Sequence, residues 1–247
     1  MPARSMLLVT VLVLGLAGCA GTGPPTASRT AVAATPSSAP SRETEVVCQP
    51  SSTNACVGTL TAGRHTSQVF EPAISFDVPD GWSNHEDEAR GYVLYAPGSV
   101  PAASEFGARD KIAILPDVAS TPKGCEAPGP DAGESAQDIA RWMTSRENLL
   151  ATAPAPISVG GLSGFVVDVR LDPAAIPECF PVPGVILFHG LGPSEGVEDG
   201  IVAGTVMRFY LLDHGDDVVA IEVVDISGGG RLDEFAAVAT SVRFDQP

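Results

Sequence analysis

Two runs of apolar and β-branched residues near the end of the chain constrain the fold more than any other feature of the sequence. Thr205–Leu212 reads TVMRFYLL, and Val218–Val224 reads VVAIEVV. Such residues favour strands, and the segment DHGDD between the two runs is typical of a turn. The sequence therefore predicts an antiparallel hairpin, around which the rest of the fold must be built.

Further strands are expected on the N-terminal side of this hairpin and after it. Ile74–Val78 alternates apolar and polar residues, Pro79-Asp80-Gly81 is a turn sequence, and Trp82 then returns to the core. The other predicted strands are Gly91–Tyr95, Lys111–Leu115, the pair Ile157–Val159 and Gly164–Leu171 around a Gly160-Gly161 turn, Val185–His189, and Val242–Phe244.

Two helices are predicted among these strands. Ser135 followed by Asp138 is a capping-box pattern, and apolar residues then recur at helical spacing to about Ala151, before Pro154 and Pro156. Those apolar residues are Ile139, Trp142, Met143, Leu149 and Leu150. The second helix carries Leu232, Phe235, Ala236 and Ala239. Because regular βαβ alternation is missing, we expect an α+β fold, an antiparallel β-sheet with two main helices packed on it.

Two short segments resemble a known group of domains. ISFDVPDGW, from Ile74 to Trp82, resembles a signature near the start of PsbP-like α/β/α sandwich domains. The ending resembles that group too, because a helix is followed by SVRF at Ser241–Phe244. The resemblance covers roughly residues 70–244. It implies a sandwich fold and a habit of binding or assisting other proteins, and it supplies no catalytic residue.

The first residues have the three parts of an export signal. Arg4 is followed by the apolar run Met6–Leu16 and then by Ala17 and Gly18 directly before Cys19. An apolar run of this length is shorter than the ~20 residues that a membrane-spanning helix needs. The sequence LAGC resembles the lipobox of bacterial lipoproteins, which implies lipidation of Cys19 and cleavage before it. The alternative is an ordinary secretory signal with an incidental cysteine.

The segment after Cys19 separates this signal from the folded part. Ala20–Glu45 is rich in Ala, Thr, Ser, Pro and Gly, so it has little apolar surface to bury and is expected to be disordered. The predicted organisation is a signal peptide over 1–18, a lipidated cysteine and tether over 19–45, and one extracytoplasmic domain over 46–247. The preference for Ala, Gly and Pro, and for Arg over Lys, favours an actinobacterial origin.

The charge excludes one large class of partners. The net charge is −16. Nucleic-acid binding depends on Lys and Arg that neutralise phosphates, so we expect no nucleic-acid partner. The acidity favours solubility outside the cell.

Four cysteines remain once Cys19 is set aside. An even number in an exported domain predicts disulfide bonds, and three pairings are open. We favour Cys48–Cys56, which would close a short polar loop, and Cys125–Cys179, which would join two proline-rich loops. A zinc site is disfavoured because no CxxC occurs and no His lies at ligand spacing from a Cys.

Two motifs suggest catalysis, and each has a simpler interpretation. Gly192-Pro193-Ser194-Glu195-Gly196 matches the G-x-S-x-G elbow of serine hydrolases, with His189-Gly190 as a candidate oxyanion segment and His214 with Asp213 as candidate partners. The two glycines of VEDGIVAG after the motif favour a loop, however, and Asp213–Asp217 fits a hairpin turn. Ser120–Lys123 matches S-x-x-K, but Pro122 and Gly124 disfavour the helix that this motif requires.

The remaining polar candidates favour structural roles. The acidic segments His85–Glu88 and Asp213–Asp217 lack the ligand spacing of a calcium loop, so solvated loops are expected there. His65 and His189 have no carboxylate next to them in sequence. Trp82 and Trp142 are expected in the core. The segment from Pro173 to Gly204, long and rich in Pro, Gly and acidic residues, is a candidate binding region or a cover tied down by Cys179.

The sequence therefore predicts a lipid-anchored protein at the extracytoplasmic face of the cell membrane. Its expected role is non-enzymatic, binding or organising another envelope protein, with no cofactor and no metal. One alternative is a carrier of a lipid or a small apolar ligand. The other is a secreted serine hydrolase that uses Ser194. The sequence assigns no ligand-binding residue.

Overall fold

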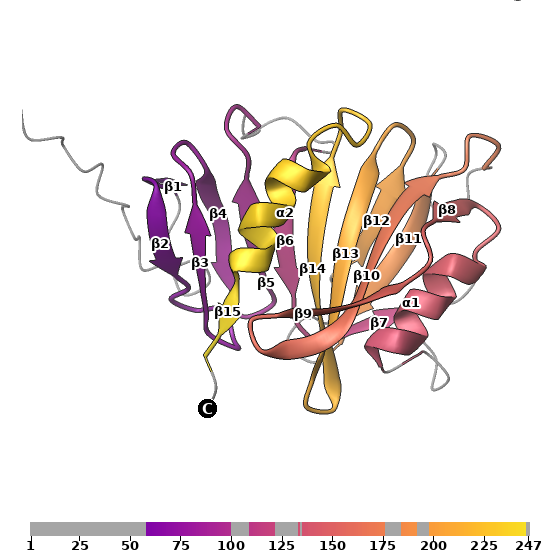
Figure 1. Cartoon of the computed structure of the whole chain (residues 1–247), viewed down its shortest axis with the longest axis horizontal. Helices are drawn as coiled ribbons and strands as arrows, with labels where there is room; N and C mark the ends of the chain where they lie inside the picture. Colours follow the sequence, from indigo (N-terminus) through magenta and orange to yellow (C-terminus); the bar gives the residue numbers. More distant parts are fainter. Residues whose placement is uncertain are drawn as a thin grey trace, which may run out of the picture. The chain divides into compact units, whose positions relative to one another are not determined.

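The computed structural model describes residues 58–99, 109–121, 133, 135–175, 184–191 and 198–245 (Figure 1). They belong to a compact unit formed by Arg42–Pro247. Cys19, the other four cysteines, Lys123 and Ser194 lie outside the described residues. In the part that is described, no helix is long and apolar enough to cross a membrane.

The largest sheet has nine antiparallel strands. In spatial order they are β1 (Gly58–Thr59), β4 (Ser83–Glu88), β5 (Gly91–Tyr95), β6 (Lys111–Leu115), β14 (Asp217–Asp225), β13 (Val206–His214), β10 (Leu162–Leu171) and β8 (Leu149–Ala151), and β9 (Ala155–Val159) also pairs with β10. The predicted hairpin is its centre, since β13 and β14 pair from Val206↔Asp225 to His214↔Asp217.

Two smaller antiparallel sheets and two helices complete the described fold. The first small sheet is β12 (Glu198–Val202), β11 (Gly184–Gly190) and β7 (Val118–Ser120). The second is β15 (Arg243–Phe244), β3 (Ile74–Val78) and β2 (Gly63–Thr66). The helices are α1 (Ala136–Ser145) and α2 (Leu232–Ser241). The predicted antiparallel α+β fold with two helices is confirmed.

Alternation along the central strands produces two separate cores, because successive side chains of a strand point to opposite faces. Tyr210 and Leu212 belong to a core with Phe235 of α2, which we call the α2-side core. Phe209 and Leu211 belong to a core with Ile139 of α1, the α1-side core. Figure 1 shows α2 lying across the large sheet, where it contacts β14 and β3.

Aromatic contacts strengthen both cores. Trp82 is buried, as predicted, and meets Phe235 edge-on with ring centroids 5.5 Å apart. Phe188 and Phe209 meet edge-on at 5.0 Å on the other face. Burying one such side chain contributes roughly 1.5–3 kcal/mol. Trp142, also predicted to be in the core, is only half-buried, with the Arg146 guanidinium 5.3 Å from its ring centre.

The first helix begins as predicted and ends six residues early. The Ser135 hydroxyl oxygen accepts a hydrogen bond from the Asp138 backbone N–H at 3.2 Å. The helix ends at Ser145, and the predicted extension to Ala151 is wrong. Leu149 lies at helical spacing from Trp142, but it is buried in β8 instead, opposite Leu171 of β10. Strand pairing at the sheet edge therefore overrides the helical periodicity.

Two strands lie where loops were expected. His85–Glu88, expected to be a solvated acidic loop, is part of β4, where Asp87 is 1% exposed. Part of the glycine-containing segment before Thr205 forms β12, which pairs with β11. Pro173–Gly204 is therefore not one long loop, because β11 and β12 occupy much of it. The second of these corrections matters for the candidate site, because β12 places the charged residue Asp199 beside the α1-side core.

Candidate functional site

Three charged residues from three different strands meet beside the α1-side core. Glu222 lies on the face of β14 that carries Val218, Ala220 and Val224 into that core. Lys111 of β6 pairs with Val224, so it lies diagonally beside Glu222 on the same face. Asp199 comes from β12 of the small sheet. We call these three residues the charged trio.

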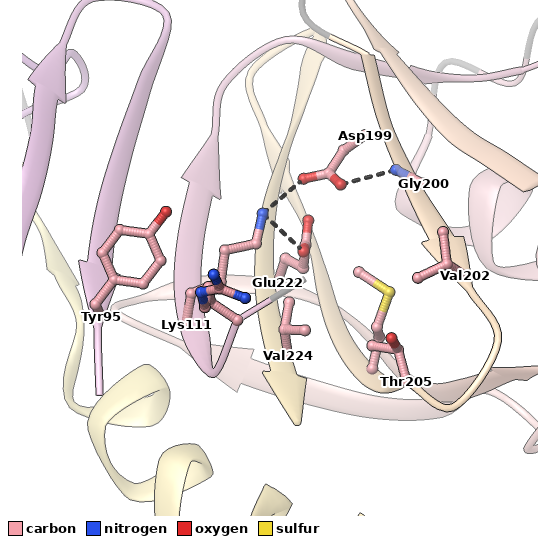
Figure 2. A pocket seen from close by; sticks show the side chains of 10 residues that line it. Tyr95, Lys111, Asp199, Gly200, Val202, Thr205, Glu222 and Val224 are labelled. Atoms are coloured by element: carbon pink, nitrogen blue, oxygen red, sulfur yellow. Dashed lines mark hydrogen bonds and ion pairs between the residues drawn. The ribbon is translucent and has the colours of Figure 1, made fainter. Parts of the chain in front are cut away.

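The trio is held together by the lysine. The Lys111 Nζ lies 3.2 Å from Asp199 Oδ2 and 3.3 Å from Glu222 Oε1. The Gly200 backbone N–H donates to the other Asp199 oxygen, Oδ1, at 2.7 Å. Figure 2 shows the two carboxyl groups pointing toward each other and toward the ammonium group.

A cavity of about 240 Å³ opens onto the trio. Its other lining residues are Tyr95, Arg109, Gly200, Val202, Thr205, Met207 and Val224. Charged groups therefore form one part of the wall, and aliphatic side chains and a methionine form another. A concave site with a few convergent polar groups is the usual form of a small-molecule site. The cavity is our candidate functional site.

The trio has unequal electrostatic environments. Glu222 is 0% exposed, and this burial, together with the negative charge of Asp199, raises the pKa of its carboxyl well above the ordinary value despite Lys111. Burial acts on Asp199 in the same direction, but the Lys111 charge and hydrogen bonds from Glu222 and the Gly200 N–H lower the pKa of Asp199 overall. Burial disfavours a charged Lys111, yet the two carboxyl groups raise its pKa. Just above the ordinary pKa of a glutamate, the trio is thus an ammonium, a carboxylate and a neutral carboxylic acid, with no net charge.

Glu222 is also poorly supplied with hydrogen-bond donors. Glu222 shares hydrogen bonds with Asp199 and Lys111, but among the described residues neither contact has good geometry, and the Lys111 Nζ lies 3.3 Å from Oε1 as an ion pair. An unsatisfied buried polar atom costs about 1–3 kcal/mol. The neutral form of Glu222 reduces this cost, and a donor that entered the cavity would reduce it further.

Another buried carboxylate among the described residues, that of Asp87, is well supplied with hydrogen-bond donors. Asp87 accepts hydrogen bonds from the backbone N–H groups of Gln68, Val69 and Phe70, at 2.6, 3.1 and 2.8 Å. These bonds fix the turn that places Phe70 in the α2-side core. The acidic segment around Asp87 is therefore structural. Residues 58–99 and 198–245 include both acidic segments from the sequence, and no three metal-binding side chains gather there.

The structure gives several of the candidate catalytic residues places in strands, a turn or a helix start. The Asp213 carboxylate accepts a hydrogen bond from the Ala136 backbone N–H at 2.8 Å, so it serves the start of α1. His214 ends β13 at the hairpin turn, and His189 is buried in β11. Ser120 lies in the strand β7, where the helix required by S-x-x-K is missing. His65 contacts the Thr61 carbonyl oxygen through Nε2 at 2.8 Å.

Sequence reasoning missed the trio, although a signal for two of its members was present. Lys111 and Glu222 each lie within a run of apolar residues that was predicted as a strand, KIAIL and VVAIEVV. A charged side chain inside a strand that is buried on both faces needs a partner. Asp199 carried no such signal, because its strand was not predicted.

Comparisons with known proteins gave few matches. No family model matches the chain, and no curated protein matches it. A crystal structure from Bacteroides thetaiotaomicron VPI-5482 matches 76% of this chain and 50% of its own, with 10% identity and a TM-score of 0.36. The solution structure of cyanobacterial PsbP (CyanoP) from Synechocystis sp. PCC 6803 matches 77% of this chain and 98% of its own, with 14% identity and a TM-score of 0.37. This chain spans half the length of the Bacteroides protein. At these TM-scores neither structure informs the function.

Proposed function

We propose that this protein is a lipid-anchored extracytoplasmic binding module without enzymatic activity, and that its cavity at the charged trio takes a small polar ligand. The observation that carries the proposal is Glu222, a fully buried carboxyl group that faces a cavity and lacks well-placed donors. Perturbed ionisable groups in a concave site are typical of functional sites.

The location of the protein is proposed from its N-terminal sequence. The run Met6–Leu16 before LAGC supports export, lipidation on Cys19 and attachment to the cell membrane. ISFDVPDGW and the terminal SVRF support a PsbP-like α/β/α sandwich. A Cys19→Ala variant should move from the membrane fraction to the soluble extracytoplasmic fraction. Retention of the variant in the membrane fraction would contradict the anchor.

A screen of small polar fragments by amide chemical shifts tests the binding site. The expected result is a set of shifts at Gly200, Val202 and Thr205. A Val202→Phe variant should lose them because the larger side chain fills the cavity. Val69→Phe is the matched control, since Val69 is 37% exposed and does not line the cavity. Shifts that survive Val202→Phe, or no shifts at all, would refute the proposed site.

The other functions predicted from the sequence require different features of the binding site. A carrier of lipids or apolar ligands requires a pocket of about 300–1,000 Å³ with mostly apolar walls. The cavity at the trio is smaller, at about 240 Å³, and has charged walls. A role in organising another envelope protein is compatible with the small-ligand site, and cross-linking in intact cells tests it. A serine hydrolase would lose turnover of esters or peptides in a Ser194→Ala variant.

A further inference from the structure

The ionisable groups in the described wall of the cavity are not balanced in charge. Lys111 and Arg109 are cations, and Asp199 is the carboxylate that lies 3.2 Å from the Lys111 ammonium. Glu222 keeps its proton above the pH at which an ordinary glutamate ionises, because it is buried beside Asp199. The charges of Lys111 and Asp199 cancel, so the Arg109 guanidinium leaves this wall with one excess positive charge. This excess is opposite in sign to the net charge of the chain, −16.

Tyr95 adds a neutral donor next to the two cations. It lies directly opposite Lys111 in the pairing of β5 with β6 (Figure 2). Burial is the main cause that raises the pKa of the Tyr95 phenol, and the charges of Lys111 and Arg109 oppose the rise. Glu86 adds to the rise, but it does not line the cavity. The phenol therefore stays protonated and presents an O–H group to the cavity, as the Thr205 hydroxyl does.

The acidic groups of the trio do not cancel this excess. Asp199 is already paired, because its Oδ2 faces the Lys111 ammonium and its Oδ1 accepts the Gly200 N–H. Glu222 contributes by staying protonated, since a second carboxylate would cancel the charge of Arg109. A guanidinium has five N–H donors in a planar fork that fits both oxygens of a carboxylate, so Arg109 can bind one beside its existing contacts.

We propose that the ligand is a small aliphatic monocarboxylate, whose carboxylate accepts hydrogen bonds from Arg109 and Tyr95 and whose carbon chain packs on the apolar part of the wall. That part is formed by Val202, Met207 and Val224, and it favours a carbon chain over a bare inorganic anion. A single excess charge favours a monoanion over a dianion. This inference rests on the proposed function, because it names the ligand class of the same cavity.

The first test compares three probes of similar size by saturation-transfer NMR at about pH 6, where an aliphatic carboxylate is ionised. Propionate has the negative charge, propionamide has the same shape without charge, and n-butylammonium has the opposite charge. Propionate should bind with a dissociation constant in roughly the millimolar range, because so few atoms supply little affinity. Propionamide and n-butylammonium should bind at least about tenfold more weakly, because they lose the charge-assisted bonds to the guanidinium. Equal binding of propionate and propionamide would overturn the inference.

The second test removes the excess charge. Arg109→Gln should weaken propionate binding by at least about tenfold and leave propionamide binding unchanged, whereas Arg109→Lys should keep part of the preference for propionate. The matched control is Arg141→Gln, which should change neither, since the Arg141 side chain is 64% exposed and does not line the cavity. A preference for propionate that survives Arg109→Gln would contradict the inference. The comparison of the three probes on the wild type does not depend on the folding of any variant.

The two levels of the proposal fail in different ways. If propionate does not bind but other polar fragments do, and Val202→Phe removes them, the carboxylate inference is wrong and the cavity remains the binding site. If n-butylammonium binds more tightly than propionate, the inferred sign of the ligand charge is wrong. If nothing binds in the cavity, both proposals are wrong.

Discussion

Asp87 and Glu222 are both acidic residues buried in strands of the large sheet, with 1% and 0% exposure, yet their surroundings differ completely. Three backbone N–H groups surround the Asp87 carboxylate and tie a turn to β4. Glu222 faces another carboxylate, one lysine and a cavity. The first arrangement uses a buried charge to fix the backbone. The second leaves a buried polar group beside a cavity with poorly placed hydrogen-bond partners, at a cost in stability.

The carboxylate of Asp225 is also surrounded by backbone N–H groups, as that of Asp87 is. Asp225 is fully buried and accepts hydrogen bonds from the backbone N–H groups of Ser227 and Arg231, at 2.7 and 2.6 Å. Burial opposes its ionisation, but hydrogen bonds from Ser227 and from the Arg231 N–H lower the pKa of Asp225 overall. The hydrogen bonds at Asp225 thus lower the pKa of its carboxyl, whereas burial beside Asp199 raises the pKa of Glu222.

Asp87→Ala should have the largest effect on stability, a loss of about 3 kcal/mol in the free energy of unfolding. The change leaves three backbone donors without their acceptor, and one of them belongs to the buried Phe70. Urea unfolding followed by circular dichroism measures this free energy. Asp216→Ala, at an exposed turn position, should change the value by less than about 0.5 kcal/mol. If the two variants lowered the free energy of unfolding equally, the structural role inferred for the buried Asp87 would be contradicted.

Lys111→Met should cost about 2 kcal/mol, because it leaves the Asp199 charge beside Glu222 without its counter-ion. Adding Asp199→Asn should restore most of this loss, since the remaining groups are then neutral. The same unfolding experiment on Lys111→Met, on Asp199→Asn and on the double variant gives the coupling free energy between the two residues. If the two losses simply add, the trio does not act as an electrostatic unit.

Glu222→Gln should change how stability depends on pH. The folded-state pKa of Glu222 is raised above its unfolded value, so its contribution is complete below about pH 4.5 and declines as the pH rises toward the folded pKa. The decline is about 1.4 kcal/mol per pH unit. Glu222→Gln removes that slope above about pH 4.5, whereas Glu147→Gln keeps it. Unfolding curves at several pH values provide the comparison, and identical slopes in wild type and Glu222→Gln would refute a raised pKa.

Ser135→Ala should have the smallest effect, a loss of about 1 kcal/mol. It removes one side-chain acceptor from one helix-terminal N–H that water can reach. The Asp213 bond to the Ala136 N–H remains. Urea unfolding again measures the change. A loss as large as that of Asp87→Ala would mean that burial of the donors is not what distinguishes the two sites.

The sequence predicted the elements whose signals are local. The hairpin of β13 and β14, the strands β3, β5 and β6, and the cap at Ser135 all follow from alternation or capping within a few residues. The end of α1 could not be predicted from local signals. Leu149 fits both a helical period and a strand pairing, and only the tertiary contact with β10 decides between them.

The candidate site was beyond sequence reasoning for a related reason. Lys111, Asp199 and Glu222 are separated by long stretches of chain, and they meet only because β6 pairs with β14 while β12 lies over the same face. The motif residues that attract attention in the sequence, His189, Asp213 and His214, instead serve a strand, a helix start and a turn.

The most direct test of the account is the ionisation state of Glu222 itself. Carbon-13 NMR of the glutamate side-chain carboxyl groups, with Glu222→Gln to assign the signal, reports whether Glu222 is neutral or charged. At about pH 5.5, where an ordinary glutamate is mostly ionised, we expect a neutral carboxyl signal for Glu222. A Glu222 signal that is already ionised at this pH would contradict the raised pKa on which the candidate site depends.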